Sequence, residues 1–184
     1  GIMDQFASVN GKKDHLLLLD CESQQAEAVP FTSDQYSILI IDSNVKHSLA
    51  SGAYGKRRTE CEVATEILNV STLRQASMVK LEENANKMDP VIFRRARHVI
   101  GEIKRTEQAA VAMKAGDWAT VGNLMLASHY SLRDDYEVSC KELDILVELT
   151  MELGEAKGVV GTRMTGGGFG GCTVSVVPTS EVDD

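Results

Sequence analysis

The sequence predicts an α+β fold, in which a block of helices packs on one face of an antiparallel sheet. Short apolar segments come first, amphipathic helical patterns fill the middle, and one more apolar segment lies near the end. Strands followed by helices and then a strand are typical of this class. With 184 residues, 43% of them hydrophobic, the chain can bury one core. We therefore expect one domain spanning residues 1–184.

Four short apolar segments are predicted strands. His15–Asp20 contains four consecutive leucines, and Ala26–Phe31 follows after a polar break. Ser37–Asp42 and Cys172–Val177 are apolar runs that are too short for helices. The first residues, Gly1–Val9, form a short amphipathic segment that ends at a turn signal.

Helical patterns cover Tyr54–Leu68 and then the stripe from Met78 to Met88. The next helix has the clearest boundaries. Asp89 is placed to cap its first turn, Pro90 occupies the first helical position, and Gly116 ends it. Apolar residues recur between these boundaries at steps of three and four, which indicates one buried face.

Two more helices follow. Asp117 is expected to cap the first, and the sequence Ser139-Cys140-Lys141-Glu142 has the form of a capping box that opens the second. The basic clusters Lys56-Arg57-Arg58 and Arg94-Arg95 are predicted to be solvated helix faces. Asp134 and Asp135 are interpreted as a solvated turn or cap, although paired carboxylates can also perform acid–base chemistry. No catalytic role is assigned to the histidines that we considered, namely His47, His98 and His129.

The charge balance limits the classes of partner. Nineteen basic residues against 27 acidic residues give a net charge of −8, which argues against binding to nucleic acid or to a membrane surface. A local group of backbone donors can still bind a nucleotide phosphate on an acidic protein. The four cysteines are widely spaced and suggest reduced thiols in a cytoplasmic protein, and we predict no metal site. The chain starts without methionine and stops just after a strand, so we expect a fragment of a longer protein.

A glycine-rich stretch near the C-terminus is the most informative segment. Five of the six residues from Gly166 to Gly171 are glycine, and ordering such a run is entropically costly. Successive N–H groups in a tight loop suit phosphate oxygens. The pattern G-x-G-x-x-G is present, but helix-like sequence precedes it and strand-like sequence follows, which is the reverse of a dinucleotide-binding motif. A flexible surface loop is the simpler alternative, against which Met164 and Phe169 are apolar anchors. Arg163, beside the loop, is expected to make a structural salt bridge.

These residues, GTRMTGGGFGGC at 161–172, resemble the third conserved motif of the GHMP small-molecule kinases, and in particular that of the galactokinases. Three other stretches agree in the same order: GIMDQF at 1–6, SNVKHSLASGAYGKRRTECE at 43–62 and SHYSLRDDYEVSCKELD at 128–144. The resemblance implies a GHMP-kinase C-terminal domain of ferredoxin-like type, truncated at both ends relative to the family. The family's two earlier motifs, which include a catalytic arginine and the main phosphate loop, are not found in this sequence.

The resemblance also implies an activity: transfer of the ATP γ-phosphoryl group to the C1 hydroxyl of α-D-galactose. Asp4 matches the family's catalytic base and also contacts the sugar, Tyr54 matches its sugar-contacting tyrosine, and Gly1 is assigned to the same sugar site. Gly166, Gly167 and Gly168 would bind ATP phosphates. Galactose, ATP and the protein's own N-terminal half are the implied partners, and the Mg²⁺ ligands are expected mainly from that half.

The residues alone support simpler interpretations. Without the resemblance, Asp4 is interpreted as a helix cap or a first-turn acid, and Tyr54 as a half-buried packing residue. At the level of function, the alternatives are a galactose- and ATP-binding sensor without turnover, a GHMP kinase for another substrate such as N-acetylgalactosamine, or a domain used only for packing. The isolated fragment is predicted to be inactive.

Overall fold

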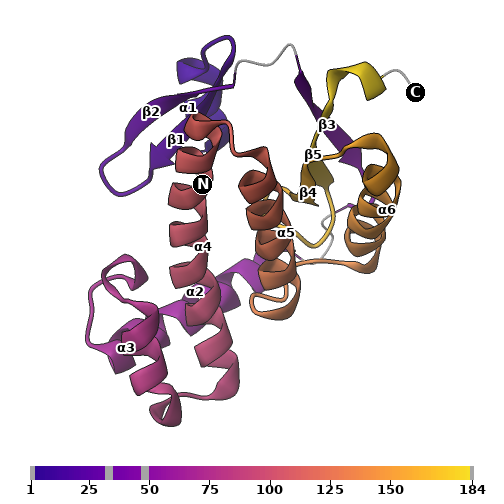
Figure 1. Cartoon of the computed structure of the whole chain (residues 1–184). Coiled ribbons are helices and arrows are strands. Elements are labelled where there is room, and N and C mark those ends of the chain that lie inside the picture. The colour runs from indigo at the N-terminus through magenta and orange to yellow at the C-terminus, as the bar shows by residue number, and fades with distance from the viewer. Residues whose placement is uncertain (1–2, 32–34, 47–49, 183–184) are drawn as a thin grey trace.

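The computed structural model describes residues 3–31, 35–46 and 50–182 of the chain (Figure 1). The helices are α1 (Met3–Asn10), α2 (Ala50–Leu68), α3 (Met78–Glu83), α4 (Pro90–Ala115), α5 (Trp118–Asp134) and α6 (Lys141–Lys157). The strands are β1 (His15–Asp20), β2 (Gln25–Pro30), β3 (Tyr36–Asp42), β4 (Gly161–Met164) and β5 (Cys172–Pro178). The α+β class predicted from the sequence is confirmed.

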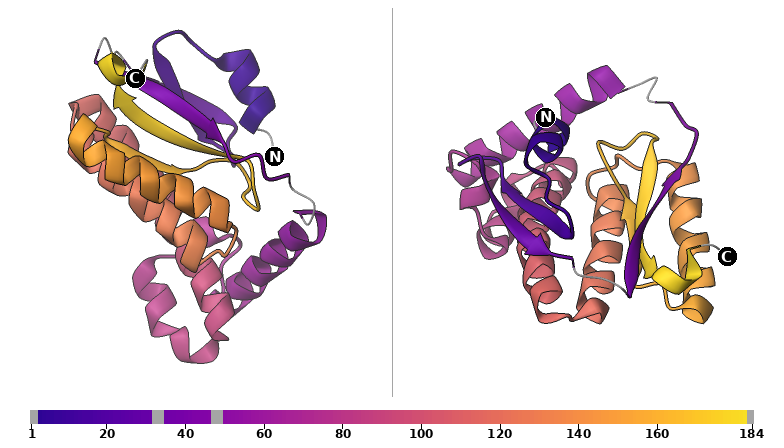
Figure 2. Two further views of the ribbon diagram at one scale, coloured as in Figure 1. Left: turned by 90° about the vertical axis from the view of Figure 1, so that its right-hand side faces the viewer. Right: turned by 90° about the horizontal axis from the view of Figure 1, so that it is seen from above.

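The strands form two small antiparallel sheets and not the single sheet that the sequence suggested. β1 pairs with β2 as a hairpin, from His15 opposite Pro30 to Asp20 opposite Gln25. The other sheet has the order β3-β5-β4. α5 and α6 pack against one face of this sheet, while the hairpin lies beside α4 (Figure 2).

Strand β4 was not foreseen, because its four residues include a glycine and an arginine and do not form an apolar run. It pairs antiparallel with β5, from Gly161 opposite Val176 to Met164 opposite Thr173. Its helix neighbour approaches closely: a Cβ on Gly122 of α5 would lie 1.8 Å from the carbonyl oxygen of Val160. Only a residue without a side chain allows this contact between α5 and the start of β4.

Helix boundaries follow the local signals in most cases. Asp89 accepts a hydrogen bond from the Val91 N–H at 2.7 Å at the start of α4, and Gly116 ends that helix with a φ of 69°. Asp117 caps α5 as predicted. The stripe from Met78 to Met88 is broken, since α3 ends at Glu83 and a short 3-10 turn covers Ala85–Lys87.

The predicted capping box at the start of α6 is wrong. Cys140 occupies the N-cap position and its side chain makes no capping hydrogen bond. The Ser139 hydroxyl instead hydrogen-bonds the Asp144 carboxylate, with 2.5 Å between Oγ and Oδ1. A side chain in the first turn of α6 therefore takes the hydroxyl that the capping-box pattern assigned to the backbone of the helix terminus.

Two groups of buried apolar side chains hold the helices and the sheet. The first joins α2, α3 and α4, with Ala64, Leu68, Leu81 and Ala96 at its centre. The second lies where the α5–α6 connection meets β4, and consists of Leu132, Val138, Leu143 and Met164. Phe169 packs against this second group, so both predicted apolar anchors of the glycine-rich stretch are packed against the core.

All four cysteines are free thiols. Among the described residues, no helix combines the length and the apolarity needed to cross a membrane.

Candidate functional site

The glycine-rich stretch forms a loop that joins the neighbouring strands β4 and β5. Its glycines adopt backbone angles that L side chains rarely allow, with positive φ values at Gly166 (76°), Gly168 (84°), Gly170 (127°) and Gly171 (86°). A strand thus precedes the loop where helix-like sequence had been expected, and a strand also follows it. The arrangement differs from the strand–loop–helix order of dinucleotide-binding motifs.

Close backbone contacts also require glycine in this loop. A Cβ on Gly168 would lie 2.1 Å from the carbonyl oxygen of Val138, and one on Gly170 would lie 2.3 Å from that of Val45. These two carbonyls accept hydrogen bonds from the loop itself, from the Phe169 N–H at 2.6 Å and from the Gly171 N–H at 3.2 Å. The loop is therefore held by two separate segments of the chain, and the alternative of a floppy linker does not describe it.

Two successive N–H groups of the loop remain open. Within the part of the chain that the structure describes, the N–H groups of Gly166 and Gly167 donate to no protein acceptor. Both glycines are exposed, and no atom lies within 4 Å of a Cβ built on Gly166, whereas Gly168, the third predicted phosphate-binding glycine, is buried at the end of this turn. Open donors on a fixed, bare backbone are suited to phosphate oxygens.

Tyr54 of α2 reaches the same loop. A Cβ on Gly167 would lie only 1.9 Å from the Tyr54 hydroxyl oxygen, so this phenol rests directly on the glycine backbone. The Tyr54 ring meets the Phe169 ring edge-on, with 5.8 Å between centroids. Tyr54 is 41% exposed, so part of the residue is accessible to a ligand. The structure thus brings together Tyr54 and the predicted phosphate-binding glycines.

His129 holds the strand that leads into the loop. Its Nδ1 accepts a hydrogen bond from the Met164 N–H at 3.3 Å, so the ring proton belongs on Nε2, which lies 3.3 Å from Asp144 Oδ1. The imidazole is fully buried, and burial lowers its pKa. A buried, neutral ring that is hydrogen-bonded at both nitrogens holds the start of the loop in place.

The basic clusters are not the solvated faces that were predicted. Arg57 of α2 and Arg95 of α4 are buried at 8% and 2% exposure, and both donate to the buried carboxylate of Glu60 at 3.0 Å. Arg95 also donates to Glu137 at 2.6 Å. Carboxylates and backbone carbonyls pair with the two guanidinium groups and allow them to be buried. This is why the prediction of solvated helix faces was wrong for Arg57 and Arg95. Lys56 and Arg58, in contrast, are exposed.

The sequence contained one signal for this network. Arg95 lies between Ile92 and Ala96, two residues of the predicted inward stripe of α4, and Arg57 precedes Glu60 by three positions on α2. A charge that is buried beside such a stripe needs a buried partner. The identity of that partner could not be read locally, because Glu137 lies 42 positions from Arg95.

Other polar residues near the loop behave as expected. Arg163 pairs with Glu102, with 3.4 Å between Nη1 and Oε1, which confirms the predicted structural salt bridge. Asp135 ends α5 and pairs with Arg97, and Asp134 pairs with Arg133.

Asp4 lies in the first turn of α1 and is exposed. Among the described residues its carboxylate has no hydrogen-bond or ion-pair partner. In both views of Figure 2, α1 and the loop between β4 and β5 lie on the same side of the molecule. Gly1, the other predicted sugar-site residue, and His47 lie outside the described residues.

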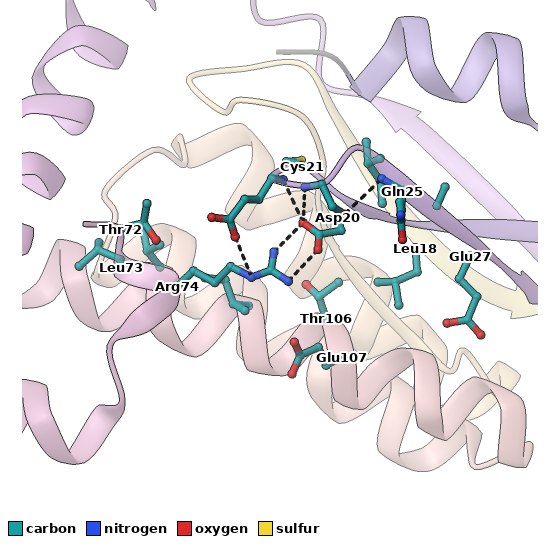
Figure 3. A pocket seen from close by; sticks show the side chains of 16 residues that line it. Leu18, Asp20, Cys21, Gln25, Glu27, Thr72, Leu73, Arg74, Thr106 and Glu107 are labelled. Carbon is teal, nitrogen blue, oxygen red and sulfur yellow. Dashed lines mark hydrogen bonds and ion pairs between the residues drawn. The ribbon is translucent and has the colours of Figure 1, made fainter. Parts of the chain in front are cut away.

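The described residues contain no cluster of three or more carboxylate, histidine or cysteine side chains that could hold a metal ion. A pocket of about 860 Å³ lies elsewhere, between the hairpin and α4 (Figure 3). Arg74 crosses it to Asp20, with 2.7 Å between Nη1 and Oδ1. The residues that line this pocket include neither Tyr54 nor any residue of the glycine loop, so the pocket is separate from the predicted site.

A protein-family model matches part of the chain, and individual known proteins match nearly all of it. Residues 109–184 match the family model described as GHMP kinases C terminal. The chain is 51% identical over 180 residues to a galactokinase of Homo sapiens, covering 98% of this chain and 45% of that protein. It is 46% identical over 189 residues to a galactokinase of Clostridium acetobutylicum, covering 100% of this chain and 48% of that protein.

A solved structure agrees with these sequence matches. The crystal structure of Lactococcus lactis galactokinase complexed with galactose superimposes with a TM-score of 0.91 at 36% identity, covering 100% of this chain and 48% of that chain. The chain therefore spans about half the length of the curated relatives and of the solved structure that it matches.

Proposed function

We propose that this chain carries the C-terminal domain of a GHMP kinase and that it is part of a galactokinase. The proposed reaction transfers the γ-phosphoryl group of ATP to the C1 hydroxyl of α-D-galactose and yields galactose 1-phosphate and ADP. Residues 1–184 then act as one domain of the enzyme, and the protein's own N-terminal half supplies the rest of the site.

One observation carries this proposal: the open N–H groups of Gly166 and Gly167 lie on a fixed loop against which Tyr54 rests. Phosphoryl transfer depends mainly on positioning and on stabilising the charge of the transferred group. Backbone donors that are already in place stabilise such charge without reorganising. A phenol suits a sugar, since it offers a flat apolar face and one hydroxyl.

In this proposal Asp4 accepts the proton of the C1 hydroxyl, or at least orients that hydroxyl toward the phosphorus atom. Its carboxylate is exposed, and no described residue competes for it. A base must reach within hydrogen-bond distance of the proton that it takes, and closure around bound substrates commonly provides that approach. Gly1 is proposed to line the same sugar site.

ATP brings Mg²⁺ with it in such reactions, where the ion bridges phosphate oxygens and neutralises their charge. The loop offers N–H donors to phosphates and no carboxylate cage for a metal among its residues. The protein ligands of Mg²⁺ are therefore proposed to come mainly from the N-terminal half.

The decisive experiment measures galactose-dependent ADP release by the protein in its natural full length. Phosphorus NMR of the product should show galactose 1-phosphate. A panel with N-acetylgalactosamine and mevalonate tests for another GHMP substrate, and calorimetry with galactose and ATP tests for a sensor. Binding of both ligands without turnover, or turnover of another acceptor only, would overturn the proposal. Residues 1–184 alone are expected to show no turnover.

A further inference from the structure

The segment that joins α5 to α6 has four successive carbonyl groups, at residues 135–138, and each one accepts a hydrogen bond from a distant part of the chain. Arg95 Nη1 donates to the carbonyl of Asp135. Arg57 Nε donates to the carbonyl of Tyr136 at 2.5 Å, and its Nη2 donates to that of Glu137 at 3.0 Å. The fourth carbonyl, that of Val138, accepts from the Phe169 N–H of the glycine loop.

Two buried guanidinium groups thus donate to the first three carbonyls, and a backbone N–H of the glycine loop donates to the fourth. Glu137 adopts a φ of 52°, a left-handed backbone angle that a residue other than glycine keeps only when its surroundings impose it. The carboxylate of Glu137 accepts a hydrogen bond from Arg95, and this contact lowers the pKa of Glu137. The connection is therefore fixed by charge-assisted contacts, which are the stronger kind of hydrogen bond.

The same helix fixes the loop at two points. Tyr54 and Arg57 are one helical turn apart on α2. Tyr54 rests directly on Gly167, while Arg57 acts through the connection and Val138 on Phe169, two residues further along the loop. A change at Arg57 would shift Phe169 relative to the Tyr54 side chain, and the open N–H groups of Gly166 and Gly167 lie just before Gly168 and Phe169.

We propose that Arg57 and Arg95 are positioning residues for phosphate binding, because they hold the 135–138 connection so that the Val138 carbonyl sets the place of the glycine loop. Neither side chain touches the loop. The substrate class that this arrangement affects is the polyphosphate of a nucleoside triphosphate, and the inference rests on the proposed function.

The test compares Arg57→Gln with the matched control Arg58→Gln in the protein at its natural full length. Arg58 is the next residue on α2, is exposed, and pairs only with Glu62 among the described residues. Steady-state kinetics should give a KM for ATP that is about tenfold higher in Arg57→Gln, with a much smaller change in kcat, because binding and not the chemical step loses its support. Arg95→Gln should act in the same direction, and Arg58→Gln should match the wild type.

Hydrogen exchange provides a readout that does not depend on activity. In Arg57→Gln, peptides that cover 165–171 should exchange faster, while peptides from β5 should keep their wild-type protection. Arg57→Lys keeps the charge opposite Glu60 but cannot span two carbonyls with one planar group, so it should fall between wild type and Arg57→Gln. If the glutamine variants do not fold, the lysine variants carry the same comparison.

The outcomes separate this inference from the proposed function. A wild-type protein without kinase activity would refute the function, and loop exchange would still test the positioning. Folded Arg57 and Arg95 variants with wild-type loop exchange would refute the inference even if the protein is an active kinase. Faster exchange spread evenly over the sheet, with an unchanged KM for ATP, would also refute it and would assign both residues to general stability.

Discussion

The hydroxyl of Tyr54 lies against the backbone of Gly167, so close that a Cβ on this glycine would be 1.9 Å from the phenolic oxygen. The two residues are 113 positions apart in the sequence (167 minus 54) and come from a helix and a strand–strand loop. The contact joins the proposed sugar-binding side chain to the proposed phosphate-binding backbone.

The first prediction follows from this contact. Gly167→Ala should displace the Tyr54 side chain, because the added methyl group would overlap its hydroxyl and part of its ring. We expect the KM for galactose to rise about tenfold, while the melting temperature changes little because Tyr54 is partly exposed and can rotate away. Steady-state kinetics with varied galactose and a thermal melt would measure both.

Gly166→Ala is the comparison variant for that experiment. No atom lies within 4 Å of a Cβ at this position, but its φ of 76° disfavours alanine. It should cost about 1 kcal/mol in backbone strain and leave Tyr54 in place. Equal effects of the two alanine variants on the KM for galactose would contradict the role given to the Tyr54 contact.

The second prediction concerns Asp4. Asp4→Asn should lower kcat by about 10² to 10⁴, because an amide cannot accept the proton of the sugar hydroxyl. Binding of galactose and ATP, measured by calorimetry, should be largely kept. Asp14→Asn is a matched control, since Asp14 is also exposed and asparagine tolerates its φ of 60°. An Asp4→Asn variant with wild-type kcat would exclude Asp4 as the base.

The third prediction tests the approach of α5 to β4. Gly122→Ala should destabilise the protein by about 2 to 3 kcal/mol, because the methyl group would meet the backbone oxygen of Val160 at 1.8 Å. Gly55→Ala, on α2 with no atom within 4 Å of the new Cβ, should be stabilising by about 1 kcal/mol through helix propensity. Urea denaturation would measure both free energies of unfolding, and a neutral Gly122→Ala would refute the close packing.

The fourth prediction concerns pH and His98. Burial lowers the pKa of His98 from 6.5 to about 4 in the folded state, where its Nδ1 lies 3.0 Å from Ser131 Oγ and its ring stacks on Tyr136. Below pH 6.5 the unfolded chain takes up a proton that the folded protein does not accept until about pH 4. The free energy of unfolding should therefore fall between these pH values, by up to about 3 kcal/mol from this group.

His98→Gln provides the test, because glutamine keeps a polar partner for Ser131 and does not titrate. Urea denaturation at pH 7.5, 6, 5 and 4.5 should show a shallower loss of stability in this variant than in the wild type. Parallel pH profiles for the two proteins would show that His98 is not the group responsible.

The sequence predicted the fold best where the deciding contacts are local. Asp89, Pro90 and Gly116 set the limits of α4 by interactions within one turn of each end, so the helix was placed correctly. β3 and β5 were found because short apolar runs are typical of strands, although Ile38 and Ile40 of β3 are exposed. β4 was missed because pairing with β5, and not its own composition, makes it a strand.

The sequence indicated which residues belong to the candidate site but not how they contact one another. The glycines of 166–171 and the anchor Phe169 could be singled out from their pattern. That Tyr54 contacts Gly167, and that Arg57 and Arg95 are buried, depends on segments tens of residues away. The Ser139 hydroxyl was wrongly assigned to the helix backbone although its partner is only five residues away, because the capping-box pattern does not include a carboxylate at the position of Asp144.

A strand, and not a helix, follows the glycine loop, and this has a consequence for how an anion would be selected there. No helix continues the chain from the last glycine, so the loop's N–H groups are not the first donors of a following helix. An oxyanion would be recognised at contact distance by the directions of a few individual N–H bonds. Such a cradle selects by shape more than it attracts by charge, and free inorganic phosphate should be a poor competitor of a ligand that is anchored elsewhere.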